Sequence, residues 1–92
     1  MLDPSTAPSP PTEQEVLLAI RTIARDELDI AREVVPDDDL VKDLRLDSMQ
    51  RITLAVALDE YFGVKVTQDA AVHVRTIGDL VGLVIELARA RA

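Results

Sequence analysis

The sequence predicts an all-α fold, a four-helix bundle with three long helices and one short helix. Aromatic residues make up only 2% of the 92 residues, and the hydrophobic content of 48% comes mainly from Leu, Ile, Val and Ala. These aliphatic residues are set among Glu, Asp and Arg, a mixture that favours helices over strands. Three capping patterns, each followed by apolar residues at helical spacing, indicate where the long helices begin.

The first long helix is expected to begin at Thr12, because Thr12 and Glu15 can form a capping box. Apolar residues then recur at helical spacing along one face. They are Leu17, Ile20, Ala24, Leu28 and Ala31. The helix is expected to end near Pro36, because the residue before a proline disfavours the α region.

The second long helix is expected to begin at Asp47, where Gln50 completes a capping box, and to end at Gly63 in a left-handed cap. Apolar residues lie on most of its sides, which predicts the most buried helix of the bundle. An unusually long loop, residues 34–46, precedes it. The apolar side chains of this loop are expected to hold it against the core.

The last third of the chain is expected to hold the short helix and the third long one. Residues 64–66 alternate like a strand but have no partner, so an extended link is expected there. Residues 68–74 are expected to form the short helix. Thr76 and Asp79 cap the last long helix. Its apolar stripe consists of Ile77, Leu80, Val81, Val84, Ile85 and Ala88.

The composition restricts the domain organisation and the kinds of partner. Residues 1–11 contain four prolines and are expected to form a disordered tail, which leaves residues 12–92 as one folded domain. The chain has no cysteine, which excludes disulfides, zinc–thiolate clusters and a thiol nucleophile. A net charge of −7 disfavours nucleic acid and anionic membranes and suits basic protein partners, although solubility explains it equally well.

The expected location is the cytoplasm. The N-terminal residues lack the apolar run of a signal peptide. No uncharged apolar stretch approaches the roughly 20 residues needed to cross a bilayer. We therefore expect a monomer without stable membrane insertion.

Ser48 is the residue best placed to carry chemistry, because it stands at the positive end of a predicted helix, where an attached anion is stabilised. A serine is also an ordinary residue at a helix start, and local chemistry alone favours that interpretation. A hydrolytic triad of Ser48, His73 and Asp47 lacks the G-x-S-x-G turn. The Asp37–Asp39 cluster lacks the glycine and glutamate of a calcium loop. The chain is therefore expected to be neither an enzyme nor a metal protein.

Residues 43–49, Asp-Leu-Arg-Leu-Asp-Ser-Met, resemble the modification site of acyl carrier proteins. Residues 40–44, 56–66 and 76–81 resemble further segments of that family in the same order. The resemblance covers about residues 13–88. It implies that a separate transferase, assisted by Mg²⁺, attaches 4′-phosphopantetheine from coenzyme A to Ser48. The arm would then carry acyl groups as thioesters.

The resemblance also implies roles for other residues. Asp47 would both cap the helix and serve the phosphopantetheinyl transferase. The acyl chain would rest between helices against Met49, Ile52, Leu58, Val66, Ile77 and Leu80. Acyl transferases, ketosynthases and other pathway enzymes would recognise Arg45, Gln50, Arg51, Thr53, Asp59 and Glu60.

The sequence departs from the carriers of bacterial fatty-acid synthesis, which show carboxylates along the second helix just after the serine. Here Gln50, Arg51 and Thr53 stand at those positions, and Arg45 replaces the usual glycine before the site. Enzymes with basic docking patches would meet like charge. These departures favour a dedicated fatty-acid, lipid or polyketide pathway. A peptidyl or aryl carrier of nonribosomal peptide synthesis and an unmodified helical adaptor are the alternatives.

Overall fold

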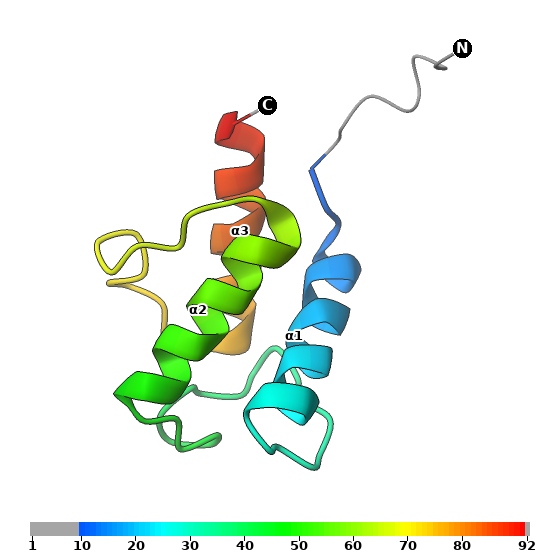
Figure 1. Cartoon of the computed structure of the whole chain (residues 1–92), viewed down its shortest axis with the longest axis vertical. Coiled ribbons are helices and arrows are strands. Elements are labelled where there is room, and N and C mark those ends of the chain that lie inside the picture. The colour runs from blue at the N-terminus through cyan, green and yellow to red at the C-terminus, as the bar shows by residue number, and fades with distance from the viewer. Residues whose placement is uncertain (1–9, 92) are drawn as a thin grey trace.

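Three α-helices pack around one aliphatic core in the computed structural model, which describes residues 10–91 (Figure 1). They are α1 (Glu13–Glu27), α2 (Ser48–Phe62) and α3 (Ile77–Arg91), and the described residues form no strand. In Figure 1, α2 and α3 run in the same direction and α1 runs in the opposite one. The predicted tail at residues 1–11 falls largely outside the described residues and stays a prediction.

The predicted helix starts are confirmed, and each rests on a local cap. The hydroxyl of Thr12 accepts the Glu15 N–H at 3.2 Å at the start of α1. At the start of α2, Asp47 Oδ1 accepts the Gln50 N–H at 2.8 Å, and the Gln50 side chain accepts the Asp47 N–H at 3.0 Å. Such caps each stabilise a helix by about 1 kcal/mol. They explain why local sequence sufficed to place these boundaries.

The end of α1 differs from the prediction. The helix stops at Glu27, well before Pro36, because Asp29 takes a left-handed conformation with φ of 56°. Aspartate tolerates this region better than most residues. The turn buries Leu28 and directs the Ile30 N–H to the carbonyl of Ala24 at 2.9 Å. Residues 28–47 therefore lie between α1 and α2, a longer loop than the predicted 34–46.

The short helix expected at residues 68–74 is not formed, so the fold has three helices and not four within the described residues. This segment is a series of turns. Ala71 donates to the Thr67 carbonyl at 3.0 Å, as in one turn of α-helix, but Val74 donates to the Ala71 carbonyl at 3.0 Å in a tighter turn. A single helical turn is unfavourable without further hydrogen bonds or packing.

The core is built mainly from α1 and α3. Two side chains of α2, Leu54 and Leu58, are buried, while Met49, Ile52 and Val56 are 70%, 49% and 49% exposed. The prediction that α2 is the most buried helix was therefore wrong. Apolar residues surround this helix, but neighbouring elements cover only part of its circumference.

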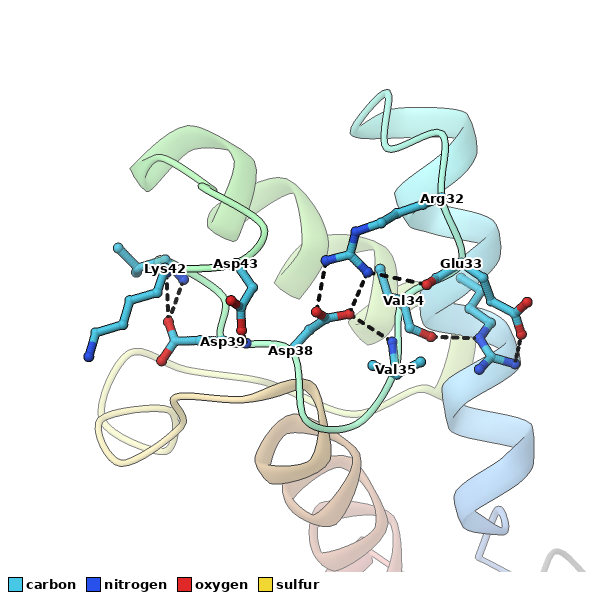
Figure 2. A network of polar contacts seen from close by, with 10 residues as sticks. Arg32, Glu33, Val34, Val35, Asp38, Asp39, Lys42 and Asp43 are labelled. Carbon is cyan, nitrogen blue, oxygen red and sulfur yellow. Dashed lines mark hydrogen bonds and ion pairs between the residues drawn. The ribbon is translucent and has the colours of Figure 1, made fainter.

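A buried carboxylate organises the loop between α1 and α2. Asp38 is 7% exposed and accepts two hydrogen bonds from the Arg32 guanidinium, at 2.7 and 2.9 Å. It also accepts the Val35 N–H at 2.8 Å, as Figure 2 shows. The bond from Arg32 lowers the pKa of Asp38 below its ordinary value, against the opposing effect of burial. The loop is thus held by a charged centre as well as by apolar contacts.

The neighbouring residues Asp39 and Asp43 accept backbone N–H groups within the loop and so stabilise its turn. Asp39 Oδ1 accepts the N–H groups of Val41 and Lys42 at 2.9 and 2.8 Å, and Asp43 accepts the Asp39 N–H at 2.7 Å (Figure 2). The bonds from Lys42 and Val41 lower the pKa of Asp39. Among residues 10–91, no group of acidic, histidine or cysteine side chains has the arrangement of a metal site.

The same loop is joined to the start of α3 by backbone hydrogen bonds. The N–H of Ile77 donates to the Asp38 carbonyl, and the N–H of Leu40 donates to the Arg75 carbonyl, each at 2.9 Å. Gly78 donates to the Pro36 carbonyl at 2.9 Å, and a Cβ at Gly78 would lie 3.3 Å from that oxygen. These bonds place the end of the loop, and hence the start of α2, relative to α3.

No helix in the described part of the chain is both long enough and apolar enough to span a membrane.

Candidate functional site

Ser48 is the first residue of α2 and is exposed. Its neighbour Asp47 is the N-cap residue, so the serine side chain stands in the first helical turn. Leu46, which is buried, precedes the cap and donates its N–H to the Leu40 carbonyl at 3.0 Å. The buried leucine anchors the chain immediately before the site, while the serine hydroxyl faces solvent.

The first turn of α2 has free hydrogen-bond donors. Asp47 takes up the N–H groups of Gln50 and Arg51, through its carboxylate and its carbonyl. Within residues 10–91, no acceptor takes the N–H of Ser48 or Met49. Free N–H groups and the positive end of a helix dipole together favour an anion at this position. This turn can therefore accept a phosphate on the serine oxygen.

Arg51 adds a cation to the same turn. Its Nη2 donates to the Ser48 hydroxyl at 3.4 Å, and its Nε donates to the Asp47 carbonyl at 3.5 Å. Three other arginines form ion pairs with carboxylates, but Arg51 forms none among the described residues. The first turn of α2 also contains no acidic residue, in contrast with the first turns of α1 and α3.

Arg45 takes a left-handed conformation, with φ of 54°. This backbone region suits glycine and costs other residues about 1–2 kcal/mol. The chain therefore carries a strained arginine at this turn. The turn itself is retained, since Leu46 and Asp47 still reach their anchoring positions.

A groove of about 560 Å³ opens beside Ser48 and runs between α2 and the segment that leads to α3. Its apolar wall includes Leu40, Ile52, Leu54, Val66, Val74 and Leu80. Its polar rim includes Ser48, Arg51, Asp59, Thr67, Gln68 and Arg75. Grooves of this size with apolar walls and a few polar groups are typical of sites for small organic ligands.

The structure divides the six residues expected around an acyl chain. Ile52, Val66 and Leu80 line the groove. Leu58 and Ile77 are fully buried in the core, and Met49 is exposed beside Ser48. Val41, Ala71 and Val74 also line the groove, from the two long loops, and no signal in the sequence pointed to them.

Besides Arg51, two of the residues expected to recognise partners make hydrogen bonds within the chain. The Gln50 side chain completes the cap of α2. Asp59 Oδ1 accepts the Val66 N–H at 2.7 Å and so fixes the extended link as one wall of the groove. Thr53 is half-buried, whereas Glu60 is exposed. Partner recognition by these residues stays a prediction.

Among the described residues, the surroundings of the Ser48 hydroxyl contain no hydrogen bond to a histidine or carboxylate. Within residues 10–91, the Ser48 hydroxyl has Arg51 as its single hydrogen-bond partner. His73 is exposed in the turns before α3. The structure therefore does not bring His73 and Asp47 together with Ser48 as a hydrogen-bonded triad.

Comparisons with known proteins show the family. The family described as "Phosphopantetheine attachment site" matches residues 19–84, a range that contains Ser48. "Acyl carrier protein 2" of Ralstonia nicotianae is 38% identical over 78 residues, which are 83% of this chain and 95% of the relative. The acyl carrier protein of a Picosynechococcus species is 32% identical, over 79% of this chain and 91% of the relative.

Mycobacterial proteins are also similar. The meromycolate extension acyl carrier protein of Mycobacterium bovis is 30% identical over 85% of this chain and 69% of the relative. The solved structure of a putative acyl carrier protein from Mycobacterium tuberculosis matches with a TM-score of 0.63 and 26% identity, over 78% of this chain and 92% of that one. Since the family match spans most of the chain, this protein belongs to the acyl carrier proteins, noncatalytic carriers with a phosphopantetheine attachment site.

Proposed function

We propose that Ser48 carries a 4′-phosphopantetheine arm and that this protein holds acyl groups on it as thioesters. The observation that supports this most strongly is the exposed Ser48 hydroxyl at a helix N-terminus with two free N–H groups. The same residue lies within the family match and at the mouth of an apolar groove. When attached, the arm supplies the thiol that this cysteine-free chain lacks.

In the attachment step the chain itself contributes the Ser48 hydroxyl and the Asp47 carboxylate. Ser48 Oγ attacks the phosphorus of coenzyme A next to pantetheine, so that an Oγ–P bond forms and the pyrophosphate bond breaks. The bisphosphorylated adenosine leaves, and the hydroxyl proton passes to a base of the separate transferase. Asp47 holds the serine in the first turn through one carboxylate oxygen, and its Oδ2 is left for the transferase.

The groove is the proposed resting place of the acyl chain. Apolar side chains from α2, the extended link and α3 form its wall, and the bond from Val66 to Asp59 keeps the link in position. Burying an aliphatic chain there is favourable by about 25 cal/mol per Å² of apolar surface. We propose that the acyl chain contacts Ile52, Val66 and Leu80, as expected from the resemblance, and also Leu54 and Val74.

The charge around Ser48 supports a dedicated pathway of fatty-acid, lipid or polyketide synthesis over housekeeping fatty-acid synthesis. Arg45 and Arg51 are exposed beside the site, and Gln50 is occupied in the cap. The proposed partners are a phosphopantetheinyl transferase, acyl transferases and ketosynthases whose docking surfaces are not strongly basic. The proposed location is the cytoplasm. The named relatives are acyl carriers, which does not favour a peptidyl or aryl carrier.

Intact mass spectrometry tests the proposal. Apo-protein incubated with coenzyme A, Mg²⁺ and a broad-specificity phosphopantetheinyl transferase should gain the mass of one phosphopantetheine. Ser48→Ala should abolish the gain. Thr53→Ala, which removes another hydroxyl from α2, should retain it. An unchanged mass of the wild-type protein with several transferases would contradict the proposal.

A further inference from the structure

We propose that Arg51 is a binding residue for the phosphodiester that joins the arm to Ser48, and that it directs the arm along the groove. The inference rests on the proposed function of Ser48. It adds an ionic contact that the chain itself supplies, on the same helical turn as the attachment point.

The position of the guanidinium is the first argument. Arg51 Nη2 already lies 3.4 Å from the oxygen that becomes part of the phosphodiester. The phosphorus bonds directly to this oxygen, and each nonbridging oxygen lies one bond further. A small rotation of the Arg51 side chain brings its N–H groups to those oxygens. Guanidinium groups suit phosphate because their donors form a planar fork.

The absence of a competing anion is the second argument. Arg21, Arg25 and Arg32 each form an ion pair with a carboxylate, whereas Arg51 forms none among the described residues. Arg75 also lines the groove but makes no hydrogen bond to Ser48, and its charge lowers the pKa of Asp39 and of Asp79. Among the described residues that line the groove, Arg51 is therefore the cation that combines contact with the Ser48 hydroxyl and the absence of an ion pair.

Asp47 makes such a cation useful. Its carboxylate caps α2 next to Ser48, so an attached phosphodiester stands beside an existing negative charge. The negative charges of the phosphodiester and of the Asp47 carboxylate would repel each other. Arg51 offsets the repulsion, because it contacts the Asp47 carbonyl and the Ser48 hydroxyl at once.

The direction of the arm follows from the helix geometry. Ser48, Arg51 and Ala55 lie three and four residues apart and share one face of α2. All three line the groove. A phosphodiester held by Arg51 is thus held on the side of α2 that the groove occupies, and the arm leaves the serine toward the apolar wall.

A comparison of apo and holo forms tests this contact without any pathway enzyme. Wild type, Arg51→Gln and Arg45→Gln are each converted to the holo form, and mass spectrometry verifies the conversion. Arg45→Gln is the matched control, because it removes the same charge near the site from a residue that makes no bond to Ser48. The thermal midpoint of each holo form is compared with that of its own apo form at low salt.

The thermal midpoint of the wild type and that of Arg45→Gln should each rise by about 2–4 °C on modification, since one charge-assisted contact has an effect of this size in a small domain. Arg51→Gln should show no rise, and Arg51→Lys should show an intermediate one. An equal rise in Arg51→Gln and in the wild type would overturn the proposal. If no variant accepts the arm, the proposed function of Ser48 fails instead.

Phosphorus NMR of the wild-type holo-protein is a second test of the contact and needs no variant. The phosphodiester signal should be displaced from that of the same protein unfolded in urea. The displacement should shrink as NaCl is raised, because salt screens an exposed ion pair. A displacement that does not change with salt would contradict the contact.

Discussion

Helices α1 and α2 have the same length but different surroundings. Each has 15 residues, yet α1 buries five side chains while α2 buries two. The aliphatic residues that α2 leaves exposed lie close to Ser48 and along the groove. Burial in α1 stabilises the fold, whereas partial exposure in α2 keeps an apolar surface available. The difference shows that a helix rich in aliphatic residues need not be the most buried one, because burial depends on which of its sides other elements cover.

The largest expected effect tests this difference with one residue type. Ile20 on α1 is 1% exposed and Ile52 on α2 is 49% exposed. Ile20→Ala should lower the free energy of unfolding by about 2–5 kcal/mol, because it leaves a cavity in the core. Ile52→Ala should lower it by less than about 1 kcal/mol. Urea unfolding of both variants measures the two values, and equal losses would break the comparison.

The loop that joins the two helices provides the next effect. Asp38→Ala should lower the free energy of unfolding by about 1–3 kcal/mol, because the Val35 N–H and Arg32 lose their acceptor. Asp37→Ala is the matched control. Asp37 is exposed and has no recorded bond among the described residues, so its replacement should cost less than about 0.5 kcal/mol.

The Asp38 effect should depend on pH in one direction. Its pKa in the folded protein is lowered below the ordinary value of 3.8, chiefly by the bond from Arg32. The folded state therefore holds this proton less tightly than the unfolded state, and the stabilisation is present above pH 3.8 and lost as the pH falls below it. The gap between wild type and Asp38→Ala should narrow in acid. A gap that stays constant there would contradict the assignment.

The smallest effect concerns Asp29 and Arg45, the two residues of this loop with a left-handed backbone conformation. Arg45→Gly should raise the free energy of unfolding by about 0.5–1 kcal/mol, because relief of strain exceeds the entropy that glycine loses. Asp29→Gly should give a smaller gain, since aspartate tolerates this conformation better. Thermal unfolding of both variants measures the order, and a loss for Arg45→Gly would refute the strain.

Local signals allowed most of the fold to be predicted. The pairs Thr12–Glu15 and Asp47–Gln50 identified two helix starts, and Gly63, with φ of 65°, ends α2 as expected. These features depend on residues within one turn of each other. The resemblance to acyl carrier proteins then led to the proposal for Ser48, whose local chemistry alone did not distinguish it from an ordinary helix-start serine.

Contacts between distant residues could not be predicted in this way. The end of α1 depends on how Leu28 packs after the turn, and the wall of the groove depends on a bond between Asp59 and Val66. The exposure of α2 depends on which of its sides the other elements cover. The contact between Arg51 and Ser48 could have been predicted from the sequence, because a spacing of three residues places two side chains on the same helix face.

The claim that Ser48 is the attachment site can be tested most directly by mapping the modification in the holo-protein. Trypsin cleavage after Arg45 and Arg51 releases residues 46–51, in which Ser48 is the sole hydroxyl-bearing residue. The next peptide contains Thr53 and serves as an internal control. Phosphopantetheine should be found on residues 46–51 alone. Its presence on another peptide, or its absence from all of them, would contradict the account.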